Sequence, residues 1–296
     1  MKKRINSGGR IARSMLPLAV VVSVVVFKPV AYADRFDAPP RERTPEHKDG
    51  LQSGLELIPD SEFAALLAKS ERHFNGNSKE RAAFIPSRLP SAHSLKPYLP
   101  PAQNQGPTPQ CTAYSLCYIK TAHEAIEELW DASLAQHRFS PAWLYNRLPH
   151  GPTGGTRITD GLELLKREGC ATLTDSRDTH RFRIHDYYAV DPKNLGIIKS
   201  LIAGGIPLVA SVHSIPALRR YRGHGVLSTY DGTPNDGYHA ITVIGYDDRR
   251  GHDGALLVQN SWGLHWGDGQ GRAWISYSLF TKICEQAFYA VDEPNS

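Results

Sequence analysis

The chain has 296 residues, of which 41% are hydrophobic and 22% charged, and its formal net charge is +4. This composition is close to that of an average globular protein, which excludes a disordered chain and a fibrous one. The length allows one large domain or two small ones and does not decide between them.

The first 33 residues have the organisation of a secretory signal peptide. Basic side chains precede an apolar run over 16–27, and Ala31 and Ala33 suit cleavage before Asp34. The apolar run is shorter than the ~20 residues that a membrane-spanning helix needs, although a retained anchor is the alternative. We therefore expect an exported protein, secreted or periplasmic, that has no membrane contact once the signal is removed.

The positive charge belongs to this segment, which holds six of the 34 Lys and Arg residues and none of the 30 acidic ones. The rest of the chain therefore has a net charge of −2, so we do not expect nucleic acid as a partner. The sequence has no Asn-x-Ser/Thr glycosylation site, which favours a bacterial protein.

Residues 34–87 are polar and rich in proline, with one short amphipathic helix expected over 61–74. They are interpreted as a pro-segment or a flexible N-terminal leader. A buried helix is predicted from Cys111 to about Trp130, and shorter helices over 160–168 and 192–203, each followed by glycine.

The C-terminal part is predicted to be mainly strands, separated by turns rich in Gly and Asp. The expected strands cover 207–212, 240–246, 255–259, 272–277 and 287–291. A helical half followed by an antiparallel β half is typical of the α+β fold class.

Cys111 stands at the start of the long predicted helix, where the helix dipole favours a thiolate, which is the nucleophilic form. The predicted hairpin over 240–259 supplies a partner. If Tyr246 lies opposite Asp253, the antiparallel register places His239 opposite Asn260. An Asn side chain beside the imidazole can fix its tautomer, so the three residues can form a Cys-His-Asn triad.

Three segments resemble the active-site blocks of papain-family cysteine peptidases, in particular bacterial members: QNQGPTPQCTAYS, GYHAITVIGYDD and LLVQNSWGLHWGDGQGRAWISY. His239 and Asn260 follow Cys111 by 128 and 149 residues, close to the spacing usual in that family. The resemblance covers about residues 88–292. It implies a two-lobe fold with the site in the cleft between a helical lobe and a β-barrel-like lobe.

The resemblance also implies roles for other residues. Gln105 would be the side-chain donor of the oxyanion hole, with the Cys111 N–H as the second donor. Trp262 would cover the Asn–His hydrogen bond, and Trp266 matches the second tryptophan of that block. The backbone of Gly154 and Gly155 would bind the extended substrate as an added strand. Beside this pair, Arg157 is expected to line the pocket for the second residue before the cut and to favour acidic or polar groups there.

The resemblance places a peptidase domain at 88–296, with a helical lobe at about 108–203 and a β lobe at about 204–296 plus the stretch 88–107. Two features depart from the family pattern. Thr108-Pro109-Gln110 replaces the usual cysteine-containing turn before the nucleophile, so the family's upstream disulfide cannot form. The leader is also short and irregular for an inhibitory pro-domain.

The function expected is a cysteine endopeptidase that works through a covalent acyl-enzyme. The alternatives are an amidase, deamidase or transglutaminase-like toxin with the same triad, and an inactive binding module on the papain fold. We expect no cofactor, no metal, a protein or peptide substrate, a monomer, and a proteinaceous inhibitor as a further partner. Cys170 and Cys284 are interpreted as a structural pair or as buried thiols, with Cys117 packed in its helix, and the connectivity stays open.

Overall fold

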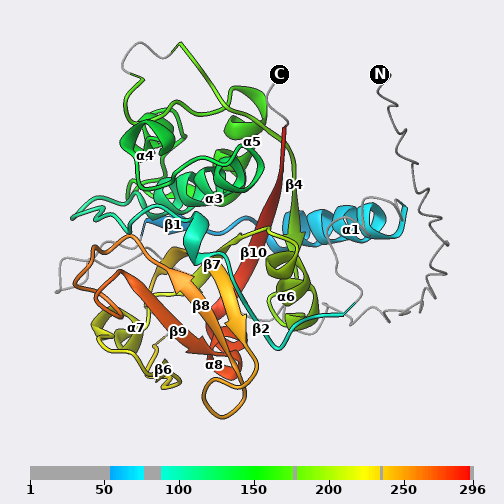
Figure 1. Cartoon of the computed structure of the whole chain (residues 1–296), viewed down its shortest axis with the longest axis vertical. Helices are drawn as coiled ribbons and strands as arrows, with labels where there is room; N and C mark the ends of the chain where they lie inside the picture. The colour runs from blue at the N-terminus through cyan, green and yellow to red at the C-terminus, as the bar shows by residue number, and fades with distance from the viewer. Residues whose placement is uncertain (1–53, 77–87, 176–178, 234–235, 294–296) are drawn as a thin grey trace, which may run out of the picture. The chain divides into compact units, whose positions relative to one another are not determined.

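The computed structural model describes residues 54–76, 88–175, 179–233 and 236–293 (Figure 1). The predicted signal peptide and the first part of the leader lie outside the described residues.

The helical lobe is built around helix α3 (Cys111–Glu127), which is buried along most of its length. Helix α4 (Pro141–Tyr145) begins after Ser140, whose side chain accepts a hydrogen bond from the Trp143 N–H. Helix α5 (Ile158–Arg167) packs closely on α3, because a side chain at Gly161 would lie 2.2 Å from Leu116 Cδ1. Glycine at this position allows the two helices to approach.

The β lobe is formed by one curved sheet with the strand order β4-β10-β5-β7-β8-β9-β6. The strands are β4 (Ile184–Val190), β5 (Leu208–His213), β6 (Val226–Leu227), β7 (Tyr238–Asp247), β8 (Ala255–Gln259), β9 (Arg272–Ser276) and β10 (Cys284–Asp292). Strand β2 (Ala92–Ser94) pairs with β7, so the stretch before α3 also joins this sheet. The observed helices and antiparallel strands confirm the predicted α+β class.

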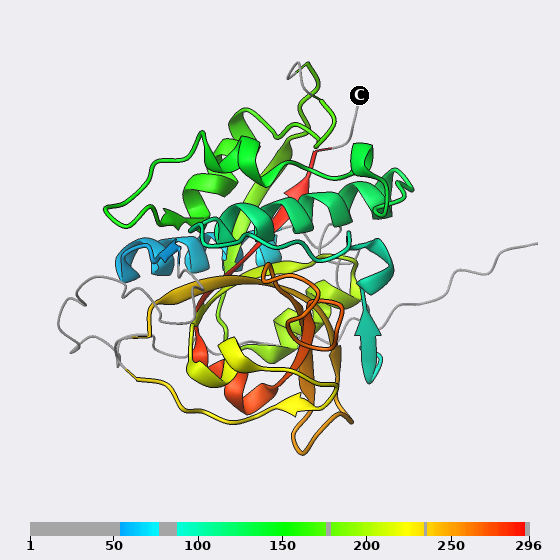
Figure 2. The same ribbon diagram turned by 90° about the vertical axis from the view of Figure 1, so that its left-hand side faces the viewer.

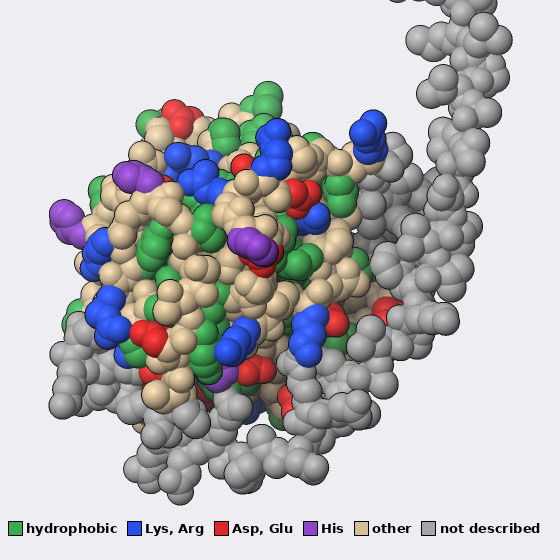
Figure 3. All heavy atoms as spheres, turned by 90° about the horizontal axis from the view of Figure 1, so that it is seen from below, with side chains coloured by type: hydrophobic (Ala, Val, Ile, Leu, Met, Phe, Trp, Pro, Cys, Tyr) green, Lys and Arg blue, Asp and Glu red, His purple; other side chains and the backbone are tan. Residues whose placement is uncertain are grey.

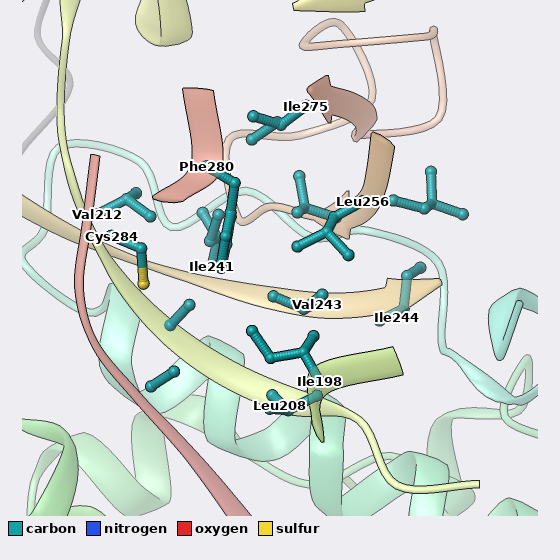
Figure 4. Close-up of a cluster of buried hydrophobic side chains, with 14 of the residues drawn as sticks. Ile198, Leu208, Val212, Ile241, Val243, Ile244, Leu256, Ile275, Phe280 and Cys284 are labelled. Carbon is teal, nitrogen blue, oxygen red and sulfur yellow. The ribbon is translucent and has the colours of Figure 1, made fainter. Parts of the chain in front are cut away.

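The strands curve around an apolar interior, seen end-on in Figure 2. Helices α6 (Leu195–Ala203), α7 (Pro216–Arg220) and α8 (Tyr277–Ile283) cover the sheet. Figure 4 shows side chains from several strands and helices meeting in this interior, among them Val243, Leu256 and Phe280, all fully buried. Tyr118 and Ala122 of α3 belong to the same core, so the core joins the β lobe to the helix that begins at Cys111.

The leader contributes two elements to the described structure. Strand β1 (Leu55–Glu56) pairs with β3 (Thr156–Arg157) of the helical lobe and with β7 of the β lobe. Helix α1 (Asp60–Gly76) follows and lies beside β4 and β10 (Figure 1). We call the line where β3 and the start of α3 face β7 the inter-lobe seam.

The predicted register of the hairpin was wrong. Strand β7 pairs Thr242 with Gln259 and Tyr246 with Leu256, and the register shifts between Val243 and Gly245. The pairing is already displaced by three residues at the turn, which takes up more residues than the predicted pairing of Tyr246 with Asp253 allows, and the bulge moves it back by only one residue. His239 and Asn260 are therefore not cross-strand partners, although their side chains still meet.

The simplest pairing of the cysteines also differs from the expectation. Cys170 contacts Cys117 in the helical lobe, whereas Cys284 begins β10 in the β lobe. All four cysteines are buried thiols.

Candidate functional site

Cys111 is the first residue of α3, and no side chain caps the helix start. Its sulfur is fully buried and contacts backbone groups of Ala240, Gly54 and Thr112. Burial raises the pKa of the Cys111 thiol, and the hydrogen bonds from these backbone groups act in the opposite direction. Because Gly54 belongs to the leader, the leader itself contributes to the burial.

Ala240 directly follows His239, so the sulfur lies against the end of β7 that carries the imidazole. The Thr242 hydroxyl donates to the Ser115 carbonyl at 3.4 Å, which joins the same strand to α3 one turn after Cys111. The nucleophile and the strand end that carries the imidazole thus come from different lobes and lie together at the inter-lobe seam.

The imidazole of His239 is held by two neighbours from the segment after β8. Its Nε2 lies 2.7 Å from Asn260 Oδ1, which also accepts a hydrogen bond of 2.7 Å from the Ser261 N–H. The second bond fixes the amide with its oxygen toward the ring, so Nε2 carries the proton and Nδ1 is the basic nitrogen of the neutral imidazole. Trp262 stacks on the ring at 4.2 Å between centroids.

Both tryptophans of this block are buried. Trp266 packs edge-on against Trp262 at 5.7 Å, and its Nε1–H donates to the Leu218 carbonyl at 2.8 Å. They form an apolar wall behind His239 and the Asn260 amide, and a hydrogen bond that is shielded from water is stronger than an exposed one.

Gln105 is positioned by the segment that carries Asn260. Its Oε1 accepts a hydrogen bond from the Ser261 hydroxyl at 2.5 Å, and its Nε2 donates to the Thr108 carbonyl at 2.7 Å. The backbone N–H of Gln105 donates to the Ser261 carbonyl at 2.8 Å. An amide nitrogen has two N–H groups, so one donor remains after the bond to Thr108.

The glycine pair lies where the leader crosses the seam. A side chain at Gly155 would meet Glu56 Cγ at 3.3 Å and the Gly54 carbonyl at 3.4 Å. Gly154 has a φ of +78°, and its carbonyl accepts a hydrogen bond from Tyr145 Oη at 2.9 Å. Arg157 is exposed and lies opposite Glu56 in the β1–β3 pairing.

The leader follows the seam past Cys111. The Thr156 N–H donates to the Gly54 carbonyl at 2.9 Å, and Leu55 is buried between Thr156 and Tyr238. Further along, the Gln286 side chain holds both backbone groups of Ile58, donating to its carbonyl at 2.8 Å and accepting from its N–H at 3.3 Å. The segment therefore occupies backbone hydrogen-bonding positions on both sides of the seam.

Sequence reasoning missed three residues of this site. Ser261 and Gln286 act through hydrogen bonds to partners 156 and 228 positions away, which no local pattern reveals. Gly54 lies in a leader of low sequence complexity. Ser261 could have been found as the neighbour of Asn260 in the NSW triplet.

None of the helices in the described part of the chain has the length and apolar character that a bilayer crossing requires.

Residues 155–291 match the model of the papain family cysteine proteases, a span that includes His239 and Asn260 and begins after Cys111. Peptidase 1 of Dermatophagoides pteronyssinus is 25% identical over 236 residues, covering 74% of this chain and 71% of that protein. Cathepsin B-like CP1 of Giardia intestinalis is 24% identical over 284 residues, covering 86% and 92%.

Solved structures share the fold. Procathepsin L2 of Tenebrio molitor superimposes with a TM-score of 0.64 at 19% identity, covering 84% of this chain and 80% of that chain. Xylellain, a cysteine protease of Xylella fastidiosa, gives a TM-score of 0.57 at 18% identity, covering 87% and 100%. The family model, the curated relatives and the two-lobe fold agree, and each of them shows a similarity of this chain to the papain family of cysteine proteases.

Proposed function

We propose that the chain is an endopeptidase that uses Cys111 as nucleophile, His239 as its proton partner and Asn260 to orient the imidazole. The observation that carries this proposal is the 2.7 Å hydrogen bond from His239 to Asn260, on a strand end whose next residue, Ala240, contacts the Cys111 sulfur.

In the proposed reaction, the Cys111 thiolate attacks the carbonyl carbon of a peptide bond while His239 is protonated. The developing oxyanion accepts hydrogen bonds from the Cys111 N–H and the remaining N–H of Gln105, each worth about 3 to 4 kcal/mol of barrier. His239 then protonates the leaving amine, and an acyl-enzyme remains. Water, deprotonated by His239, releases the second product.

The proposed substrate-binding site is the strand edge with which the leader pairs in this structure. Gly155 and Thr156 offer backbone groups on one side and Tyr238 on the other, which suits an extended polypeptide added as a strand. The side chain of Arg157 lies at the open end of this edge. On the face drawn in Figure 3, basic and acidic side chains are interspersed, which supports a protein substrate over nucleic acid.

We further propose that residues 34–87 act as an inhibitory pro-segment of an exported precursor, and that residues 88–296 form the mature enzyme. The support is the path of Gly54 to Ile58, which fills the positions that a substrate backbone would use. Export rests on the signal-like first 33 residues.

The test compares the wild-type chain with Cys111→Ala and Asn260→Ala variants, using an unfolded protein as substrate and mass spectrometry to identify the products. We expect no cleavage by Cys111→Ala and a smaller loss for Asn260→Ala, because the orienting residue does not touch the reacting atoms. The control is Cys284→Ala, which replaces a cysteine of the β-lobe core, and this variant should cleave the same bonds as the wild-type chain.

The alternatives give different products. If glutamine side chains are altered or new amide cross-links form without backbone cleavage, the protein is a deamidase or a transglutaminase and not an endopeptidase. If an epoxide inhibitor of thiol proteases leaves no adduct on Cys111 after the leader has been displaced, the protein is a binding module instead.

A further inference from the structure

Three cysteines have no part in the proposed reaction. Cys117 lies on α3, one and two-thirds turns after Cys111, and is 3% exposed. Cys170 follows Gly169 directly after α5 and is fully buried, and Cys284 begins β10. Their positions in the two lobes decide which two of them can form a disulfide bond.

Cys117 and Cys170 are neighbours in the helical lobe: burial raises the pKa of the Cys117 thiol, and the nearby Cys170 thiol raises it further. The close packing of α5 on α3 at Gly161 and Leu116 joins the two elements that carry them, since Cys117 follows Leu116 on α3 and Cys170 lies three residues after the end of α5. The chain at Cys170 is itself fixed, since its backbone N–H and carbonyl both pair with Phe182, at 3.0 and 3.1 Å.

Cys284 lies elsewhere. Figure 4 shows its sulfur in the apolar interior of the β lobe, beside Val212 and Ile241. Its Sγ lies 3.5 Å from the Gln286 carbonyl. It lies among the strands of the β-lobe core, whereas the neighbour of Cys117 is Cys170, so the structure favours the Cys117–Cys170 pair.

We propose that Cys117 and Cys170 form a structural disulfide when the chain folds in an oxidising compartment. One thiolate attacks a low-molecular-weight disulfide and forms a mixed disulfide, and the second thiolate then displaces the remaining small thiol. One S–S bond forms in the protein and one is lost in the reagent. The two protein thiols are oxidised, and the reagent is reduced to two thiols that take up their protons.

The bond would join the helix that carries the nucleophile to the end of α5. Because α5 starts immediately after β3, the strand along the seam, the disulfide would hold Cys111 and the substrate-binding edge in a fixed relation. It would also remove two thiols that could otherwise exchange with Cys111. The inference does not depend on the proposed peptidase activity, since the bond itself is measured.

The experiment uses the full chain with Cys111→Ala, refolded with oxidised and reduced glutathione or with a reductant only. After unfolding and alkylation, the oxidised sample should carry one alkyl group, on Cys284, and the reduced sample three. A tryptic peptide pair joined through Cys117 and Cys170 identifies the bond. Since the two cysteines are 53 positions apart, oxidation should raise the melting temperature by roughly 10 °C.

Matched variants separate the pair from the remaining cysteine. Adding Cys117→Ala should abolish the difference between the oxidised and reduced melting temperatures, whereas adding Cys284→Ala should leave it intact. Three alkylated cysteines in the oxidised sample, or a cross-linked peptide that contains Cys284, would overturn the proposal.

Discussion

The Ser261 hydroxyl is the contact through which the segment after β8 orients Gln105. Asn260 and Ser261 are consecutive, and one orients the imidazole while the other holds the amide that faces the nucleophile loop. The same short segment thus positions two different side chains at the inter-lobe seam. Thr108 and Trp262 add a second contact to Gln105 and to His239, respectively.

Replacing Ser261 with Ala removes this hydrogen bond and lets the Gln105 amide rotate. We expect kcat to fall about tenfold, less than the loss of about 10²-fold or more expected for Gln105→Ala, because the donor is misplaced and not removed. The measurement is kcat and KM on a peptide substrate, together with the rate at which iodoacetamide alkylates Cys111. If Ser261 only supports the local structure, its replacement should change both kcat and the rate of Cys111 alkylation. If it orients Gln105, kcat should fall and the alkylation rate should stay unchanged.

At this scale the sequence predicted the contact between His239 and Asn260 but not the partners that hold Gln105 and Ile58. His239 and Asn260 were found because the histidine and asparagine stand in short blocks whose order and spacing are typical of the family. Gln286 and Ser261 were not found, because their hydrogen bonds join segments that are distant in the chain. Only the folded sheet brings these partners together.

Helix α1 anchors the leader on the pair β4 and β10. Phe63 is fully buried and packs edge-on against Phe288 at 5.5 Å, and the Ser70 hydroxyl donates to the Ala189 carbonyl at 2.7 Å. Lys69 adds a hydrogen bond of 2.8 Å to Asp186. These contacts hold α1 on the sheet. Because α1 begins just after residues 54–58, the part of the leader at the seam is fixed on its C-terminal side.

Replacing Phe63 with Ala should weaken this anchor, since truncating a buried Phe costs about 3 to 5 kcal/mol of packing. We expect the full chain to become active sooner after purification and the active form to have unchanged kcat and KM. The assay follows the lag before cleavage of a peptide substrate. Ala65→Gln, on the exposed side of the same helix, is the control and should keep the original lag. An unchanged lag for Phe63→Ala would show that the anchor does not limit release.

The elements themselves were predicted more closely than their pairing. The long helix at Cys111 and the strand at 255–259 begin where the apolar pattern and the turns indicated. The strand β4 and the short helices α4, α7 and α8 were missed, because short segments carry too few residues to show a period. The register of the β7–β8 hairpin was wrong because Tyr246 pairs with Leu256 and not with Asp253, and local composition did not show how many residues the turn takes up.

Across the whole molecule, the leader contributes to the environment of the nucleophile. With Gly54 against the sulfur, burial dominates and the pKa of Cys111 is raised. A raised pKa keeps the group protonated to higher pH, so the precursor contains less thiolate at a given pH. Removing the leader admits water and reverses the largest cause of the shift.

We therefore expect the pH profile of Cys111 alkylation to move to lower pH when the precursor is processed. At neutral pH the processed enzyme should react faster with iodoacetamide, and the two forms should converge at high pH, where both are thiolates. The measurement is the alkylation rate over a pH series, with the modified peptide identified by mass spectrometry. Identical profiles would mean that the leader does not govern the thiol.

The pairing of β1 with strands of both lobes has a thermodynamic consequence. While it is present, the chain has an additional strand bonded across the two lobes, and the amide protons of Thr156 and Ile58 are locked in hydrogen bonds. Removal of the leader would break those bonds, and the two lobes would gain freedom to separate. The precursor would then be the more heat-resistant form, slower to exchange its amide hydrogens with solvent, and catalytic competence would be gained at the expense of durability.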